Sequence, residues 1–259
     1  MEKGVRVYRV PVGDRSRTKI FLHTFRQPQL QQSWRMVLEA EQPDLVHIEH
    51  LMGLPVSLVA DLREQGIPYV VTLHDYWYVC ANAQLLTNTE QKVCSGPDAK
   101  ALNCARCALA RADYNSALNA APLFAPIMNA RNSQTAAVLK DASRIIAPTR
   151  FVRDIYLSLV SDEIEIDVLS HGIALPKEFV EMAQSDRRKQ RQDGRVRVGY
   201  IGSIAWQKGV HVLVSAVNAM SEDDIVLTLY GDLTAFPEYA SELRELIERP
   251  GIELRGTVD

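Results

Sequence analysis

The chain has 259 residues, 47% of them hydrophobic and 24% charged, so it is long enough to bury one large core or two ordinary ones. Its formal net charge of −3, with basic and acidic residues interspersed, argues against nucleic acid as a partner, because a polyanion attracts a positive surface. No apolar run is long enough to cross a bilayer, so we expect a cytoplasmic protein for which peripheral membrane contact stays possible.

The first two-thirds of the chain alternate short apolar runs with segments of helical period. This alternation is typical of parallel sheets built from strand-helix-strand units. The expected strands cover residues 5–10, 45–48, 69–73, 144–147 and 164–169. The expected helices cover residues 29–41, 55–65, 126–140 and 151–159. We therefore predict an N-terminal Rossmann-like domain over residues 1–172, of the doubly wound kind.

A polar and basic stretch, residues 181–195, then interrupts the pattern. We interpret it as part of a linker over residues 173–194 rather than as an anion-binding patch, because charge runs are usually solvated. The alternation resumes with strands at 196–201, 225–230 and 252–255 and helices at 210–220 and 239–248. The fold class is thus α/β with two Rossmann-like domains, the second of which, residues 195–259, we expect to be incomplete. The first strand also begins almost at Met1 and lacks the glycine-rich turn that often opens such a sheet, so we expect truncation at both ends.

Ligands of open parallel sheets bind at the carboxyl ends of the strands, so the residues just after each strand are candidate site residues. His74 and Asp75 follow the strand at 69–73. A histidine there can donate to a sugar or phosphate oxygen, and Asp75 can fix its tautomer or accept a hydroxyl. The alternative is a histidine that only satisfies backbone groups of the loop.

A second candidate site connects the strand at 196–201 to the next helix. Gly202, Ser203, Lys208 and Gly209 lie in this turn, where glycine lets a ligand approach and a helix amino terminus attracts an anion. The turn therefore suits a diphosphate, although Lys208 could simply face solvent. Gly231 follows the strand at 225–230 and could lie against a base or ribose, but a plain turn explains it as well.

All four cysteines fall in one stretch of the chain: Cys80, Cys94, Cys104 and Cys107. A disulfide is the less suitable use in a cytosolic protein. The close spacing of the last two permits a tetrahedral thiolate site for one structural zinc ion. Four buried free thiols are the other interpretation, and both remain open.

At these residues the chain resembles glycosyltransferase family 4, which has the GT-B fold. The resemblance rests on the residues Thr-Leu-His-Asp-Tyr-Trp at 72–77 and on segments 147–152, 170–173 and 200–209. It implies transfer of a sugar, with retention of configuration, from a nucleotide-diphosphate sugar to a glycan, lipid-linked or small-molecule acceptor. It also implies that His74 faces the donor sugar and diphosphate, that the turn with Lys208 binds the diphosphate, and that no catalytic metal is needed.

Two departures from the family pattern affect the expected activity. Ser203 stands where the family commonly has arginine, and the family's Glu-x7-Glu donor motif would lie beyond the last residue. We therefore expect the chain as given to be inactive in transfer. The alternatives are a non-catalytic sugar-nucleotide-binding or regulatory relative, and an epimerase of the same architecture.

Overall fold

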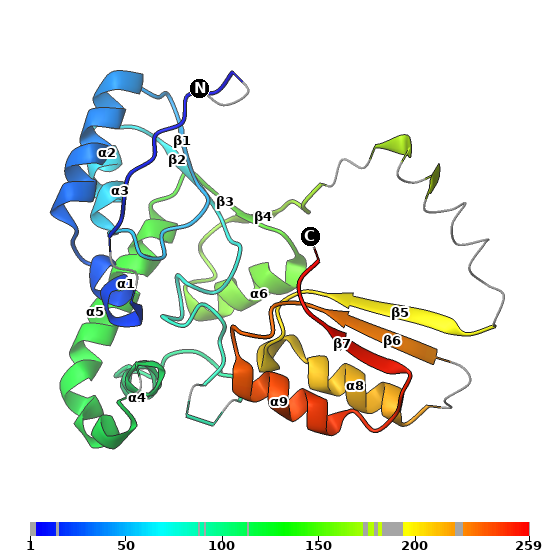
Figure 1. The fold of residues 1–259 in the computed structure, drawn as a ribbon. Helices are drawn as coiled ribbons and strands as arrows, with labels where there is room; N and C mark the ends of the chain where they lie inside the picture. The colour runs from blue at the N-terminus through cyan, green and yellow to red at the C-terminus, as the bar shows by residue number, and fades with distance from the viewer. Residues whose placement is uncertain are drawn as a thin grey trace. The chain divides into compact units, whose positions relative to one another are not determined.

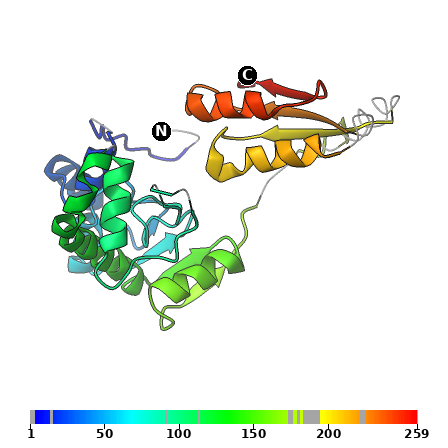
Figure 2. The same cartoon turned by 90° about the horizontal axis from the view of Figure 1, so that it is seen from below.

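The computed structural model describes residues 4–13, 16–87, 89–90, 92–112, 114–172, 176–178, 181–182, 194–220 and 225–258. The chain divides into two compact units, Met1–Gly172 and Ile173–Asp259. Each unit is built around its own parallel sheet (Figures 1 and 2). Most of the expected linker lies outside the described residues. In the part of the chain that the structure describes, no helix combines the length and the apolar character needed to span a membrane.

The first unit alternates strands and helices around a four-stranded sheet. Its elements are α1 (Arg17–His23), α2 (Pro28–Glu41), β1 (Val46–Ile48), α3 (Ser57–Glu64), β2 (Tyr69–Thr72), α4 (Leu102–Arg111), the 3-10 helix η1 (Asn115–Ala120), α5 (Ala121–Lys140), β3 (Arg144–Ala147), α6 (Arg150–Leu159) and β4 (Ile166–Val168). The strand order is β1-β2-β3-β4, and every neighbouring pair is parallel. The carboxyl ends of all four strands therefore meet at one edge of the sheet.

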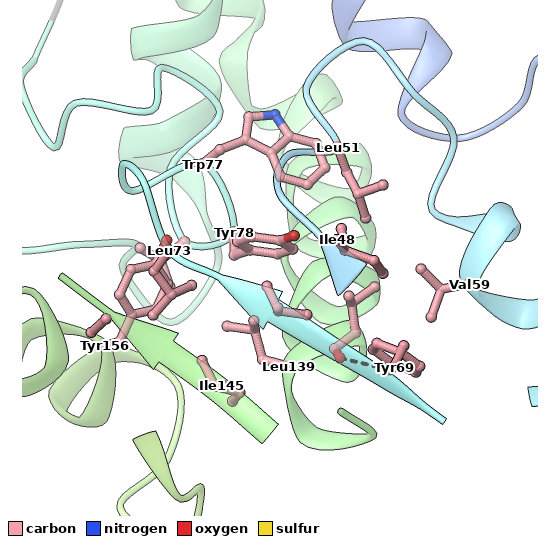
Figure 3. Packing of buried hydrophobic residues seen from close by; sticks show 14 of the residues in the cluster. Ile48, Leu51, Val59, Tyr69, Leu73, Trp77, Tyr78, Leu139, Ile145 and Tyr156 are labelled. Atoms are coloured by element: carbon pink, nitrogen blue, oxygen red, sulfur yellow. Dashed lines mark hydrogen bonds between the residues drawn. The ribbon is translucent and has the colours of Figure 1, made fainter. Parts of the chain in front are cut away.

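The core of this unit forms where the apolar strands meet the helices (Figure 3). Val71 and Leu73 are fully buried, and Leu139 of α5 packs in the same cluster. The Tyr69 hydroxyl, also in the core, donates to the carbonyl of Val138 at 2.7 Å, so its polar atom is satisfied. Burial of each large apolar side chain stabilises the folded state by about 1.5–3 kcal/mol. This packing holds the strands in place, and with them the polar residues at their carboxyl ends.

The strand expected at residues 5–10 does not form. Residues Val5, Val7 and Tyr8 are 64%, 44% and 50% exposed. Pairing of this segment with the sheet would therefore gain no stability from apolar burial. The segment is instead held by polar contacts: the Tyr8 hydroxyl donates to Glu41, and Arg6 Nη2 lies 2.9 Å from Glu41 Oε2. An alternating apolar pattern predicted a strand here, but the structure does not bury either face.

Several helices differ from the sequence-based expectation. α1, α4 and η1 were not predicted, and α5 begins at Ala121 rather than at residue 126. Pro126 therefore lies inside α5. A proline inside a helix costs a hydrogen bond, but Ala121 and Ala125 are buried against α4, and this packing outweighs the local preference.

The second unit contains β5 (Val196–Ile201), the 3-10 turn η2 (Trp206–Lys208), α8 (Val210–Asn218), β6 (Ile225–Tyr230), α9 (Pro237–Leu246) and β7 (Ile252–Arg255). Its strands pair in parallel in the order β5-β6-β7, and their bounds match the predicted ones. Leu227 and Leu229 alternate along β6 and pack with side chains of both α8 and α9. The two helices therefore cover the same face of this sheet.

Candidate functional site

Histidine or carboxylate side chains follow three of the four strands of the first sheet. Glu49 and His50 come directly after β1, His74 and Asp75 follow β2, and His171 follows β4. Because the strands are parallel, these residues share the carboxyl edge, where open α/β sheets bind their ligands. The structure thus places His74 and Asp75 at the same edge as Glu49, His50 and His171, which the sequence motifs did not identify as site residues.

His74 is paired with Glu49 rather than with Asp75. Its Nε2 lies 2.5 Å from Glu49 Oε2, and the two side chains are 36% and 61% exposed. The hydrogen bond from His74 lowers the pKa of Glu49 below its usual value, with a smaller contribution from nearby histidines and partial opposition from burial. An ionised carboxylate only accepts, so Nε2 is the donor of this pair. The Nδ1 atom of His74 is therefore the ring nitrogen that can contact a substrate.

Two other histidines adjoin this pair. The His171 ring stacks on the His74 ring with centroids 5.5 Å apart and planes at 5°. His47 Nδ1 lies 3.6 Å from Glu49 Oε1, and its Nε2 contacts the Thr72 hydroxyl at 2.7 Å. Glu49 thus lies among three imidazoles, and its carboxylate is the negative group around which they gather.

His50 and Asp75 form a second pair at the same edge. The backbone N–H of Met52 donates to His50 Nδ1 at 2.8 Å, so a neutral His50 carries its proton on Nε2 and donates it to Asp75 Oδ2, 2.8 Å away. The other oxygen of Asp75 accepts from the backbone N–H of Trp77 at 2.8 Å. The buried Tyr156 also donates to the Asp75 carbonyl at 2.7 Å. Both side chains of the pair remain 33% exposed, so a hydroxyl group can reach them.

Three residues of this edge were not predicted from the sequence as site residues: Glu49, His50 and His171. His171 lies within segment 170–173, which contributes to the family resemblance, but no role was expected for it. The signal that identifies His74, a polar residue directly after a parallel strand, applies equally to Glu49 and His50. The choice of partner, Glu49 for His74 and His50 for Asp75, depends on how neighbouring strands place these side chains.

The second unit places the predicted diphosphate turn between β5 and α8. Gly202 directly follows β5, Lys208 ends the 3-10 turn η2, and Gly209 adopts a left-handed conformation at φ 68° before α8 begins. Lys208 therefore precedes the helix rather than lying in its first turn. The backbone N–H of His211, in that first turn, already donates to the Tyr239 hydroxyl at 3.0 Å. One backbone N–H group at the start of α8 is therefore already hydrogen-bonded within the protein and does not point at an anion.

Gly231 has a structural reason to be glycine. A Cβ atom at this position would lie 2.1 Å from the carbonyl oxygen of Gly202 and 2.8 Å from a side-chain carbon of Ile204. The backbone of the Gly202 turn therefore occupies the space beside Gly231. Close packing between two turns accounts for this glycine without a bound base or ribose.

The four cysteines line one cavity of the first unit, together with residues of α1, α4 and α5. Burial, with a contribution from the other three thiols, raises the pKa of Cys104 to about 12. Yet among the described residues no three His, Cys, Asp or Glu side chains are grouped so that they could hold a metal ion. The expectation of a structural zinc ion at Cys80, Cys94, Cys104 and Cys107 is therefore not supported, because sequence spacing does not ensure that thiols converge on one point.

Solved structures of similar fold include HepE from Anabaena and a sucrose-phosphate synthase. HepE solved with UDP-glucose is 16% identical, with a TM-score of 0.52 over 90% of this chain and 54% of HepE. HepE solved with UDP and glucose is 17% identical, with a TM-score of 0.50 over 89% of this chain and 53% of HepE. Sucrose-phosphate synthase from Thermosynechococcus elongatus is 15% identical, with a TM-score of 0.63 over 98% of this chain and 55% of that protein. The likeness shows a fold of two Rossmann-like α/β units of the GT-B type, and the chain spans just over half the length of these structures.

None of the curated proteins matches the chain. The family model of the glycosyl transferase 4-like domain matches residues 1–172, which is the whole first unit. This match includes both histidine-carboxylate pairs and covers well over half of the sequence. The chain therefore belongs to the glycosyl transferase 4-like family.

Proposed function

We propose that this chain belongs to a cytoplasmic enzyme that transfers a sugar from a nucleotide-diphosphate sugar to an acceptor, with retention of configuration. The observation that carries the proposal is the Glu49–His74 pair at the ligand-binding edge of the family domain. The resemblance described above assigns His74 to the donor sugar and diphosphate. HepE, a protein of similar fold, was solved with UDP-glucose, which supports a nucleotide sugar as the ligand class.

In the proposed reaction Glu49 orients His74 through Nε2, and Nδ1 of His74 contacts the donor. Because Nε2 donates to Glu49, Nδ1 of a neutral His74 is an acceptor, so it can hold a hydroxyl group of the donor sugar in a fixed position while the sugar-phosphate bond breaks. The hydrogen bond to Glu49 also restricts ring rotation, so His74 loses less freedom when the substrate binds.

The His50–Asp75 pair is proposed to position the acceptor hydroxyl. Asp75 keeps exposed carboxylate surface although His50 and Trp77 both donate to it, and a carboxylate oxygen can accept more than one hydrogen bond. The acceptor can be a glycan, a lipid-linked sugar or a small molecule.

The second unit is proposed to bind the diphosphate through the Gly202–Gly209 turn. Lys208 is the cation of this turn, and the left-handed Gly209 has no heavy atom within 4 Å of the place where a Cβ would lie. An anion can therefore approach the backbone there closely. The scheme uses no catalytic metal.

The test is His74→Ala in the protein encoded by the complete gene, assayed with a panel of nucleotide sugars. Loss of a group that positions the reacting sugar can cost about 10²-fold in rate, so we expect kcat to fall by about 10²-fold in His74→Ala, and Glu49→Gln to give a smaller loss. His23→Ala, which removes an imidazole from α1, is the matched control.

An unchanged kcat in His74→Ala would return this residue to a structural role and contradict the proposal. Nucleotide binding without product formation by any variant would support the non-catalytic relative instead. The anomeric configuration of the product, read by NMR, separately tests retention.

A further inference from the structure

The first unit contains a cavity of about 290 Å³ that no part of the proposed reaction uses. Its walls come from α1, α4, α5 and the loops that follow β1 and β2. Most of the lining is apolar, including Phe21, Leu109, Phe124 and Met128. A cavity of this size and character is typical of a site for a small apolar group.

Two residues connect the wall of the cavity to the His50–Asp75 pair. Met52 donates its backbone N–H to His50, and Trp77 donates its backbone N–H to Asp75, both at 2.8 Å. Both Met52 and Trp77 also line the cavity. The Trp77 ring lies 6.0 Å from the His50 ring, centroid to centroid. The cavity and the pair therefore share two residues and are neighbours.

The wall beside Trp77 is rigidly built. The fully buried Arg131 places its guanidinium 4.9 Å from the centre of the Trp77 ring and donates to the Trp77 carbonyl. Thr135, one turn further along α5, donates to the Tyr78 carbonyl at 2.6 Å. These contacts hold the backbone at Trp77 and Tyr78, and a wall that is held in place before a ligand enters reduces the entropic cost of binding.

We propose that this cavity binds the apolar group of the acceptor, so that the acceptor is an amphipathic molecule with a hydroxyl head and an alkyl or aryl tail. This inference rests on the proposed function, because it places the hydroxyl of the acceptor at His50 and Asp75. It narrows the acceptor from a glycan, a lipid-linked sugar or a small molecule to a molecule that carries a hydrophobic group.

The test compares n-octyl β-D-glucopyranoside, below its micelle concentration, with methyl β-D-glucopyranoside. The two share a sugar head and differ in the tail, so we expect the octyl compound to bind at least about tenfold more tightly, the effect of burying about two methylene groups. We also expect it alone to slow N-ethylmaleimide labelling of Cys80, a partly exposed cysteine of the lining, as followed by peptide mass spectrometry.

A larger side chain in the cavity should remove this preference. Ala108 of α4 is a partly exposed lining residue, so Ala108→Phe should fill the space and abolish both tight binding and protection of Cys80. Ala60→Phe on the exposed face of α3 is the matched control, and melting temperatures check that both variants fold.

Equal affinity for the two glucosides, or unaltered labelling of Cys80 in the unmodified protein, would overturn the inference. Neither measurement needs turnover. Failure of the proposed function, seen as an absence of sugar transfer, is therefore distinguishable from failure of the cavity assignment. Where transfer occurs, a lower KM for the octyl acceptor than for the methyl acceptor supports the inference.

Discussion

The carboxyl edges of the two sheets are built from different chemistry. The edge of the first sheet carries two histidine-carboxylate pairs, Glu49–His74 and His50–Asp75. The described edge of the second sheet carries the glycine turn with Lys208, and its Gly231 is packed against the backbone of Gly202. The first edge can orient groups and exchange protons, whereas the second can approach an anion closely.

In the proposed reaction, this difference would divide two demands between two units of similar architecture. Ionisable pairs need neighbouring strands that bring side chains from distant parts of the sequence within hydrogen-bonding distance. A phosphate turn needs backbone freedom and one nearby positive charge, which a short segment can supply by itself. The three predictions below test whether the edges depend on these different features.

The largest effect is expected where the second edge depends on close backbone packing. Gly231→Ala would place a Cβ atom 2.1 Å from the Gly202 carbonyl oxygen, so the two turns must move apart. We expect this change to destabilise the second unit by about 3 kcal/mol, the upper part of the usual range for overpacking. Urea denaturation, followed by a probe in the second unit, measures the effect.

Gly199→Ala is the control for this experiment. It makes the same substitution in strand β5, where a Cβ atom would meet no heavy atom within 4 Å. Equal losses of stability in the two variants would show that the contact between the turns is not what requires glycine at 231.

A smaller effect is expected for the positive charge at the second edge. If the Gly202–Gly209 turn binds diphosphate, Lys208→Ala removes a charge-assisted contact worth about 1.5–3 kcal/mol, or at least about tenfold in the Kd for UDP or GDP. Isothermal titration calorimetry on the chain measures it. Arg244→Ala, which removes a positive charge from the exposed side of α9, should leave the affinity unchanged. Equal affinities of Lys208→Ala and the unmodified chain would place the phosphate site elsewhere.

The smallest effect concerns the acid stability of the first edge. The pKa of Glu49 is lowered from its ordinary value of 4.5 in the folded state, so its contribution to stability is present above that value and is lost as the pH falls through the folded pKa. Glu49→Gln should therefore lose less stability than the unmodified protein on acidification below about pH 4.5. The difference should stay below about 1 kcal/mol, because the Glu49 side chain is 61% exposed and well screened.

Thermal unfolding of both proteins between neutral pH and the acid limb measures this difference. Glu245→Gln makes the same chemical change at an exposed position of α9 in the second unit and is the control. A Glu49→Gln variant that is as acid-sensitive as the unmodified protein would show that the contact with His74 contributes no pH-dependent stability.

Much of the architecture was predictable from the sequence because it depends on local apolar periodicity. The strands β3, β5, β6 and β7 have the predicted bounds, since short runs of branched and apolar residues ended by proline or glycine are typical of a strand. The alternating pattern at residues 5–10 predicted a strand that does not form, because alternation does not reveal whether a neighbouring face will bury it.

The sequence by itself determined the α/β class, the position of His74 and Asp75 after a strand, and the glycine turn at 202–209. These features depend on neighbouring residues and on the rule that sheets bind ligands at their carboxyl edges. Only the tertiary structure decided that Glu49 pairs with His74, that His50 pairs with Asp75 and that the four cysteines line a cavity without forming a metal site. The physical reason is that each of these depends on the register of separate strands and the packing of separate helices, which sets distances between side chains that spacing along the chain leaves undefined.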